Sequence, residues 1–94
     1  MINITDVQII LVKKTNQISK LKCFANIIFD NMFIVRNIRV IEGQKGFFIV
    51  MPNSKKKDGS FQDIAHPLTN QFRQIIDDKV FEAYEKALNE RSNQ

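Results

Sequence analysis

The spacing of apolar residues along this chain changes once, at His66-Pro67, and that change limits the folds open to it. Before this point, apolar residues alternate with polar ones or fill short runs rich in β-branched types, a pattern typical of strands. After it, they recur at steps of three and four residues, which is typical of one long amphipathic helix. The residue before a proline is pushed away from helical dihedrals, so the sheet region ends here. Strands followed by a single helix predict an α+β fold with an antiparallel sheet.

Turn signals divide the sheet region into about five strands. The first two runs cover residues 5–14 and 21–29, with a polar break at 15–17 between them. Asp30-Asn31 tolerates positive φ, so the run 32–41 that follows at once predicts a tight hairpin with the second strand. Alternate residues in the first two runs share an apolar face: Val7, Ile9 and Leu11 in the first, and Leu21, Cys23, Ala25, Ile27 and Phe29 in the second.

The remaining sheet signals follow a turn at residues 42–46, where Gly43 and Gly46 suit positive φ at one or both sites. The run 47–51 is apolar at every position, which predicts a strand buried on both faces. Pro52 then ends its ladder because proline has no N–H to donate. Residues 52–60 form the clearest loop, in which Asp58-Gly59 is a hairpin signal, and 61–64 predict a short returning strand.

The helical segment spans about residues 69–90, with Thr69 as its expected N-cap. Its apolar stripe is Phe72, Ile76, Val80, Ala83, Tyr84 and Ala87, widened by Ile75 and Leu88. The 94 residues leave room for one domain over 1–94, with the sheet at 4–65. A chain this short has a thin stability margin, so we expect self-association.

Charge is distributed unevenly around a formal net value of +4. Residues 1–67 hold ten Lys/Arg against five Asp/Glu, whereas residues 68–94 hold four against five. A basic region attracts phosphates or acidic membrane surfaces, although modest basicity equally serves solubility. No apolar run approaches the roughly 20 residues of a membrane span, and no secretory signal is visible. We therefore expect a cytoplasmic protein without a membrane partner.

Little in the chain favours catalysis or a cofactor. Cys23 is the only cysteine and lies in an apolar run, so we expect it in the core, with neither a disulfide within the chain nor a metal site. His66 is the only histidine, and Asp63 three residues earlier is a conceivable acid–base partner. No nucleophile motif accompanies them, so a structural role at the strand–helix junction is favoured. We expect no enzyme activity, metal, cofactor or small-molecule substrate.

Two arginines in the third strand do not form an obvious binding patch. Arg36 and Arg39 are three residues apart, so in a regular strand they point to opposite faces. They share one patch only if a bulge intervenes. We expect at least one of them to have a structural ion pair, for instance with Asp6 or Glu42.

The strongest candidate binding residues are Lys55, Lys56 and Lys57, which lie beside the turn at Asp58-Gly59. A two-stranded basic ribbon can enter the major groove of DNA or follow a phosphate backbone. A solvated loop is the alternative. Arg73 lies in the first turns of the helix, where free N–H groups attract phosphate, and Gln71 and Gln74 are candidate base contacts. A surface arginine is the alternative reading of Arg73.

The run 39–52, Arg-Val-Ile-Glu-Gly-Gln-Lys-Gly-Phe-Phe-Ile-Val-Met-Pro, followed by Asp63-Ile-Ala-His-Pro67, resembles the SpoVG family of sporulation and septation proteins. The stretches 4–7 and 33–39 look similar too, so the resemblance covers roughly residues 4–88. It implies a twisted antiparallel sheet with a C-terminal helix, assembled as a homodimer through strands from both chains. It also implies a bacterial regulator that binds DNA, and in some members RNA, without enzyme activity or cofactor.

In related members the start of the C-terminal helix is tied to DNA contact, which corresponds here to residues 70–75. The chain departs from relatives that carry a more polar segment there, because Phe72, Gln74 and Ile75 replace small or basic residues while Arg73 is kept. The short acidic tail of the family is nearly absent. A protein-interaction module in division or sporulation control, with no direct nucleic-acid role, stays as the second hypothesis.

Overall fold

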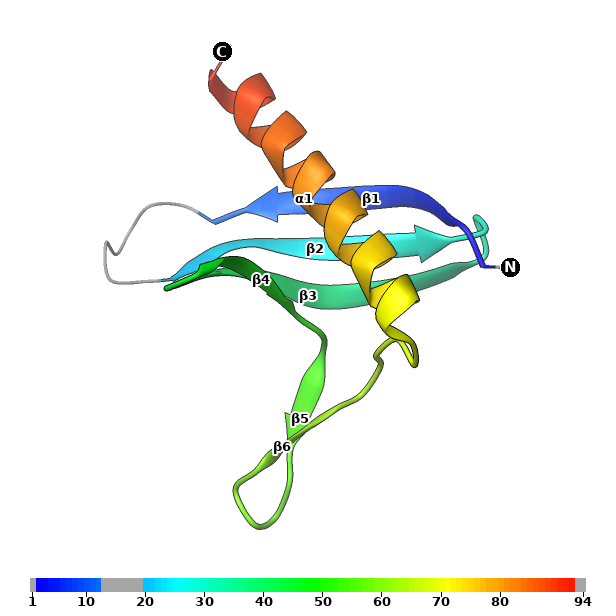
Figure 1. The fold of residues 1–94 in the computed structure, drawn as a ribbon, viewed down its shortest axis with the longest axis vertical. Helices are drawn as coiled ribbons and strands as arrows, with labels where there is room; N and C mark the ends of the chain where they lie inside the picture. The colour runs from blue at the N-terminus through cyan, green and yellow to red at the C-terminus, as the bar shows by residue number, and fades with distance from the viewer. Residues whose placement is uncertain (1, 13–19, 93–94) are drawn as a thin grey trace.

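The fold consists of a four-stranded antiparallel sheet, a two-stranded ribbon and one long helix (Figure 1). The computed structural model describes residues 2–12 and 20–92. The elements are β1 (Ile4–Leu11), β2 (Leu21–Phe29), β3 (Phe33–Gly43), β4 (Gly46–Val50), β5 (Asn53–Lys55), β6 (Phe61–Asp63) and α1 (Asn70–Ser92). The predicted break at 15–17, and the end of the first predicted strand at 13–14, lie outside the described residues. The α+β class predicted from the sequence is confirmed.

The sheet has the strand order β1-β2-β3-β4, so consecutive strands are neighbours throughout. The predicted hairpin between β2 and β3 is confirmed, and Phe29 pairs with Phe33 at its end. Its turn uses φ of 51° at Asp30 and 55° at Asn31, the left-handed conformation that these side chains tolerate. At the β3–β4 turn, Gly46 has a φ of 122°, as the glycine spacing predicts.

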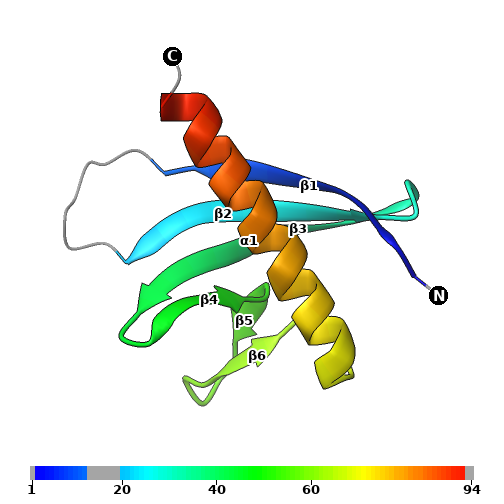
Figure 2. The same ribbon diagram turned by 45° about the horizontal axis from the view of Figure 1, so that its top comes forward.

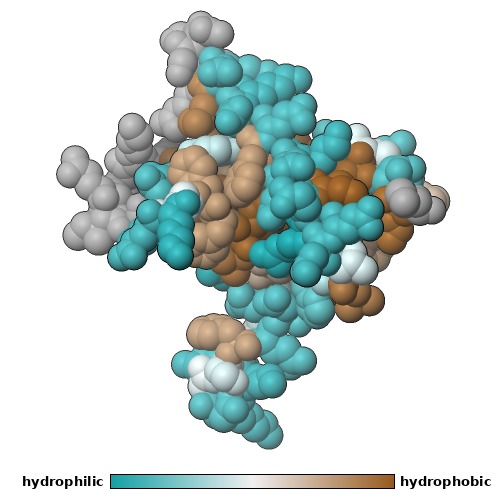
Figure 3. All heavy atoms as spheres, viewed as in Figure 1, coloured by the Kyte–Doolittle hydropathy of each residue, from teal (hydrophilic) through white to brown (hydrophobic). Residues whose placement is uncertain are grey.

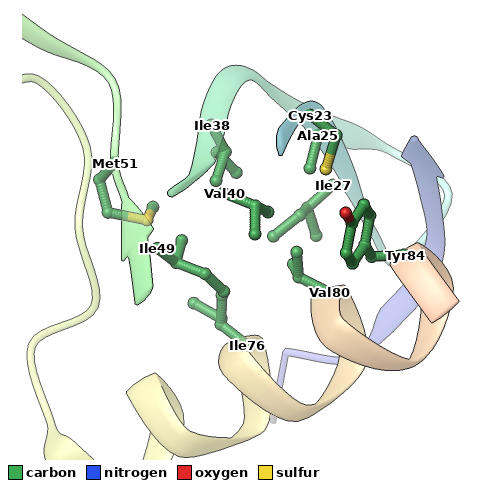
Figure 4. Close-up of a cluster of buried hydrophobic side chains, with 10 residues drawn as sticks. All are labelled: Cys23, Ala25, Ile27, Ile38, Val40, Ile49, Met51, Ile76, Val80 and Tyr84. Carbon is green, nitrogen blue, oxygen red and sulfur yellow. The ribbon is translucent and has the colours of Figure 1, made fainter. Parts of the chain in front are cut away.

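The core lies between α1 and one face of this sheet (Figure 4). Side chains from β2, β3 and β4 meet three residues of the helix there, Ile76, Val80 and Tyr84. The other buried members are Cys23, Ala25, Ile27, Ile38, Val40, Ile49 and Met51. Burying each large aliphatic side chain contributes about 1.5–3 kcal/mol, so this one interface supplies most of the hydrophobic stabilisation. The face that the helix leaves uncovered is called the open face below.

The prediction that 47–51 is buried on both faces is wrong. Ile49 and Met51 are in the core, but Phe47 is 46% and Phe48 is 48% exposed. Phe47 lies on the helix side, since its ring contacts that of Tyr84 at 5.8 Å between centroids in an edge arrangement. Only one layer covers the sheet, and β4 is its edge strand, so an apolar run here is not enclosed.

The ribbon corrects the predicted strand count. The expected single sheet of about five strands is in fact six strands in two sheets, because β5 occupies part of the predicted loop 52–60 and pairs with β6. Both ribbon views show β5 and β6 extending away from the main sheet (Figure 2). Ile64 N–H donates to the Pro52 carbonyl at 2.7 Å and closes the base of this ribbon. The predicted returning strand at 61–64 is confirmed as β6, whereas β5 is short and polar and carries little hydrophobic periodicity from which to predict it.

The helix begins as its sequence predicts. The Thr69 hydroxyl accepts a hydrogen bond from Phe72 N–H at 3.1 Å, and the Thr69 carbonyl accepts one from Arg73 N–H at 3.0 Å. These bonds satisfy N–H groups that a helix start leaves free. Among the described residues, no helix is both long and apolar enough to cross a membrane.

Candidate nucleic-acid interface

The three predicted lysines lie at the tip of the ribbon. Lys55 ends β5, and Lys56 and Lys57 enter the turn that leads to β6. Lys56 N–H donates to the Ser60 carbonyl at 2.7 Å, and Gly59 closes the turn with a φ of 91°. All three lysine side chains are exposed. The turn therefore holds a compact group of positive charges away from the body of the protein.

No carboxylate neutralises these lysines within the described part of the chain. The nearest acid along the sequence, Asp58, is engaged elsewhere. Its Oδ1 accepts hydrogen bonds from the Ser60 hydroxyl at 2.6 Å and the Ser60 N–H at 2.9 Å. These bonds lower the pKa of Asp58. Figure 3 shows that the protruding ribbon presents mainly hydrophilic residues. Such a group can contact phosphates without first breaking an ion pair.

The two glutamines at the helix start differ in how free they are. Gln71 is exposed in the first turn. Gln74 is also exposed, but its Nε2 donates to Asp78 Oδ1 at 2.8 Å, one turn further along the helix. Gln74 can therefore reach a base edge only by giving up this bond, whereas no side-chain bond of Gln71 is seen among the described residues.

Arg73 is directed toward its own sheet. Its Nη2 donates to the Ile49 carbonyl at 2.7 Å, and its Nε lies 3.7 Å from Asp77 Oδ1. The pKa of Asp77 is raised because desolvation outweighs the attraction of Arg73. The arginine thus anchors α1 to β4, and 38% of its side chain stays exposed. Contact between Arg73 and phosphate stays a prediction.

The ribbon and the helix start follow one another in the chain and lie toward the same side of the main sheet. Residues 64–69 connect them, and both views place them on the side of the sheet where β4 forms the edge (Figures 1 and 2). The structure therefore brings Lys55, Lys56, Lys57 and Gln71 to one side of the molecule. We take the ribbon tip together with the exposed start of α1 as the candidate interface.

The prediction for Arg36 and Arg39 needs two corrections. The register of β2 against β3 shifts between Ala25–Ile38 and Ile27–Val35, so β3 has one extra residue opposite Asn26. This bulge, with φ of 65° at Asn37, puts both arginines on the open face. The expected ion pair is also absent from the described residues, because Glu42 pairs with Lys22 at 2.8 Å instead.

The residues weighed for catalysis are not arranged as a site. His66 Nδ1 lies 2.9 Å from the Pro67 carbonyl, next to it in the chain, and no bond to Asp63 links the conceivable pair. Cys23 is fully buried, and burial raises its thiol pKa to about 11. No group of three or more potential metal ligands occurs among the residues with described positions.

One feature escaped the sequence analysis, an apolar hollow of about 230 Å³ beside the helix start. It lies between the β2–β3 turn and α1, and Met32 and Phe33 on its rim are 85% and 66% exposed. Its lining residues are Ile2, Phe29, Asp30, Met32, Phe33 and Phe72. The available signal was the pair Met32-Phe33, two large apolar residues placed directly after a tight turn.

Comparison with known proteins gives one consistent result. The family model of SpoVG matches residues 2–86. A protein of Clostridioides difficile strain 630 is 48% identical over 85 residues, covering 90% of this chain and 89% of its own. Proteins of Bdellovibrio bacteriovorus and Borrelia hermsii are 52% and 48% identical, covering 73% and 89% of this chain and 64% and 88% of their own. All three are named "Putative septation protein SpoVG".

Proposed function

Because this chain belongs to the SpoVG family, we propose that it is a dimeric bacterial regulator that binds DNA, and also RNA, in the cytoplasm. The relatives are named septation proteins, which supports septation as a process that it regulates. The proposal extends to the gene expression of sporulation or virulence programmes. It acts by binding to nucleic acid, without a catalytic step, a cofactor or a small-molecule substrate.

The observation that carries this proposal is the lysine triplet at the tip of the ribbon. Lys55, Lys56 and Lys57 are exposed, adjacent and without an ion pair among the described residues. A protein that neutralises phosphates releases the counterions condensed on the nucleic acid, which drives binding. A narrow two-stranded ribbon also has the shape that a major groove admits. Gln71 and Gln74 then supply amides for base edges, and Arg73 contributes its exposed portion.

A second copy of the chain completes the proposed binding unit. Strands β1 and β4 are the two edges of the main sheet, and each pairs with only one neighbouring strand. The backbone N–H and C=O groups on the outer side of an edge strand can pair with another chain. Pairing of one edge with the same edge of a second copy gives a closed two-fold dimer. Such a dimer presents two lysine ribbons, which matches the two-fold symmetry of duplex DNA.

The test is fluorescence anisotropy with a labelled duplex DNA and the K55A/K56A/K57A variant. The matched control is K45A/K79A/K86A, which removes three exposed lysines from the β3–β4 turn and from α1. We expect the ribbon variant to bind at least about tenfold more weakly and the control to change little, because of these six lysines only those of the ribbon contact phosphates in the proposal. Equal losses in both variants would show a non-specific effect of net charge and contradict the assignment.

The hollow beside the helix start favours a second candidate function, a protein-interaction module in cell-division control. An apolar hollow with Met32 and Phe33 exposed on its rim is a surface that partner proteins bind. Capture of a partner should then survive nuclease treatment and be lost in Met32→Ser. Capture that disappears on nuclease treatment would favour the nucleic-acid function.

A further inference from the structure

The open face of the main sheet is the second surface with the chemistry of a binding site. Helix α1 crosses the sheet on one side only, and the ribbon extends beyond its edge (Figures 1 and 2). None of the described helices or strands covers the other side. Strand register assigns alternate residues to this face, opposite those that form the core. Among them are Phe24, Asn26, Arg36, Arg39 and Phe48.

The β-bulge in β3 is what brings positive charge to this face. Val35 and Ile38 are both on the helix side, where Val35 packs against the core and Ile38 is fully buried. Arg36 follows the first and Arg39 follows the second, so both project to the open side. Both are exposed, and no ion pair engages either within the part of the chain that the structure covers. Asp6, on the edge strand β1, is the one carboxylate that the described pairings place on this face.

Aromatic residues occur on both strands that neighbour the second arginine. Arg39 pairs with Phe24 of β2 on one side and Val50 of β4 on the other. Phe48 pairs with Ile41, so Arg39 and Gly43 are its diagonal neighbours, and its ring is turned toward Gly43, where a Cβ atom would lie 2.9 Å from ring atom Cε1. Phe48 is 48% exposed, and Phe24 is half-buried among its neighbours in the sheet although no layer lies over it. The open face therefore offers two rings on which unpaired bases can stack, one on each strand that neighbours Arg39.

Amide groups lie beside the first arginine. Asn26 Nδ2 donates to Gln8 Oε1 at 3.3 Å, and Asn26 Oδ1 accepts from Asn37 N–H at 3.4 Å. These long bonds hold the Asn26 amide at the bulge next to Arg36. The same face therefore combines rings for stacking and guanidinium groups for phosphates, whereas the Asn26 amide reaches a base edge only by giving up these bonds.

We propose that the open face binds single-stranded nucleic acid, with bases on Phe24 and Phe48 and phosphates on Arg36 and Arg39. A flat face can stack only unpaired bases, because those of a duplex are already stacked inside it. Two unneutralised arginines against one distant carboxylate give the face the charge that phosphates require. Edge-strand pairing of two copies leaves this face free. The proposal rests on the proposed function for the ligand class, but it names a different surface and a different form of nucleic acid.

The test measures anisotropy of a short labelled single-stranded RNA and of a duplex DNA with the same variants. R36A/R39A removes the two arginines, and Phe48→Leu removes a ring while keeping an apolar side chain. K79A/K86A is the control, since it removes two exposed positive charges from α1 and so gives the same net charge as R36A/R39A.

We expect R36A/R39A to bind single-stranded RNA about tenfold more weakly and to lower the salt slope by about 1.4, which corresponds to two phosphates of a single strand. Phe48→Leu weakens binding about fivefold or more and leaves the slope unchanged, because a ring carries no charge. Both variants keep duplex affinity within about twofold of the wild type, since the proposed duplex contacts belong to the ribbon and the helix start.

These variants distinguish duplex binding by the ribbon from single-strand binding by the open face. If K55A/K56A/K57A loses duplex binding while the face variants retain RNA binding, the proposed function stands and this inference is overturned. If the wild type binds neither probe, both are overturned. Light scattering on the same samples supplies a third outcome: a change of oligomeric mass in R36A/R39A or Phe48→Leu would show that a second copy covers the open face, which also overturns the inference.

Discussion

Arg73 allows the structural and binding roles of the helix start to be separated, because its contacts within the chain are defined. Its Nη2 donates to the carbonyl of Ile49, a residue whose surface is only 3% exposed, at 2.7 Å. Replacing it in Arg73→Met keeps a long apolar stem but removes the guanidinium. A hydrogen bond from a charged donor contributes about 1.5–3 kcal/mol net, and its loss leaves the Ile49 carbonyl without this partner.

The contact with Asp77 adds little to this value. The Arg73 Nε and Asp77 Oδ1 atoms are 3.7 Å apart, and the two side chains are 38% and 28% exposed. Partly exposed pairs of this kind contribute about 0–1 kcal/mol. We therefore expect Arg73→Met to lower the free energy of unfolding by about 1.5–3 kcal/mol in total.

Urea unfolding followed by circular dichroism measures this change, with the m-value checked for constancy. Gln74→Ala is the control, because it removes a neighbouring bond between the exposed side chains of Gln74 and Asp78 and should cost less than about 0.5 kcal/mol. A free energy of unfolding for Arg73→Met within about 0.5 kcal/mol of the wild type would refute the anchoring role.

Three further predictions concern stability. Thr69→Ala should cost about 0.5–2 kcal/mol in urea unfolding, because the Phe72 N–H loses its cap; no loss would contradict the capping geometry. Asn37→Val should cost about 1–2 kcal/mol more than Asn37→Gly, because φ is 65° there; equal values would argue against the left-handed bulge. Burial raises the Cys23 pKa to about 11, so the unfolded chain loses this proton first and stability should fall as pH rises from 9 to 11. Cys23→Ala should show a smaller fall over that range, and identical pH profiles would oppose this assignment.

The features predicted from sequence are those that local chemistry determines. Asp30-Asn31 forms a turn because these side chains tolerate positive φ, and Thr69 caps the helix because its hydroxyl reaches a free N–H. The 3.6-residue period likewise identified Ile76, Val80 and Tyr84 as the buried face of α1. Each of these predictions needed only residues a few positions apart.

The features that escaped prediction depend on tertiary partners. Phe47-Phe48 has the apolar pattern of a buried strand, but its exposure depends on how many layers cover the sheet. The bulge at Asn37 follows from the register against β2, which moves Arg36 and Arg39 to one face. In the sequence, Arg73 is equally suited to bind a phosphate or a backbone carbonyl. Its hydrogen bond to the Ile49 carbonyl depends on the position of β4, which only the structure shows. In the candidate site, sequence therefore predicted which residues are basic and exposed but not which are already engaged.

The salt dependence of duplex DNA binding tests the central claim most directly. In a plot of log affinity against log salt concentration, each phosphate contacted contributes about 0.9 to the slope. Removal of Lys55, Lys56 and Lys57 should therefore flatten the slope by about 2.7 for each ribbon engaged, whereas K45A/K79A/K86A should leave it near the wild-type value. An unchanged slope in K55A/K56A/K57A would show that the lysine ribbon does not contact phosphates and would contradict the account.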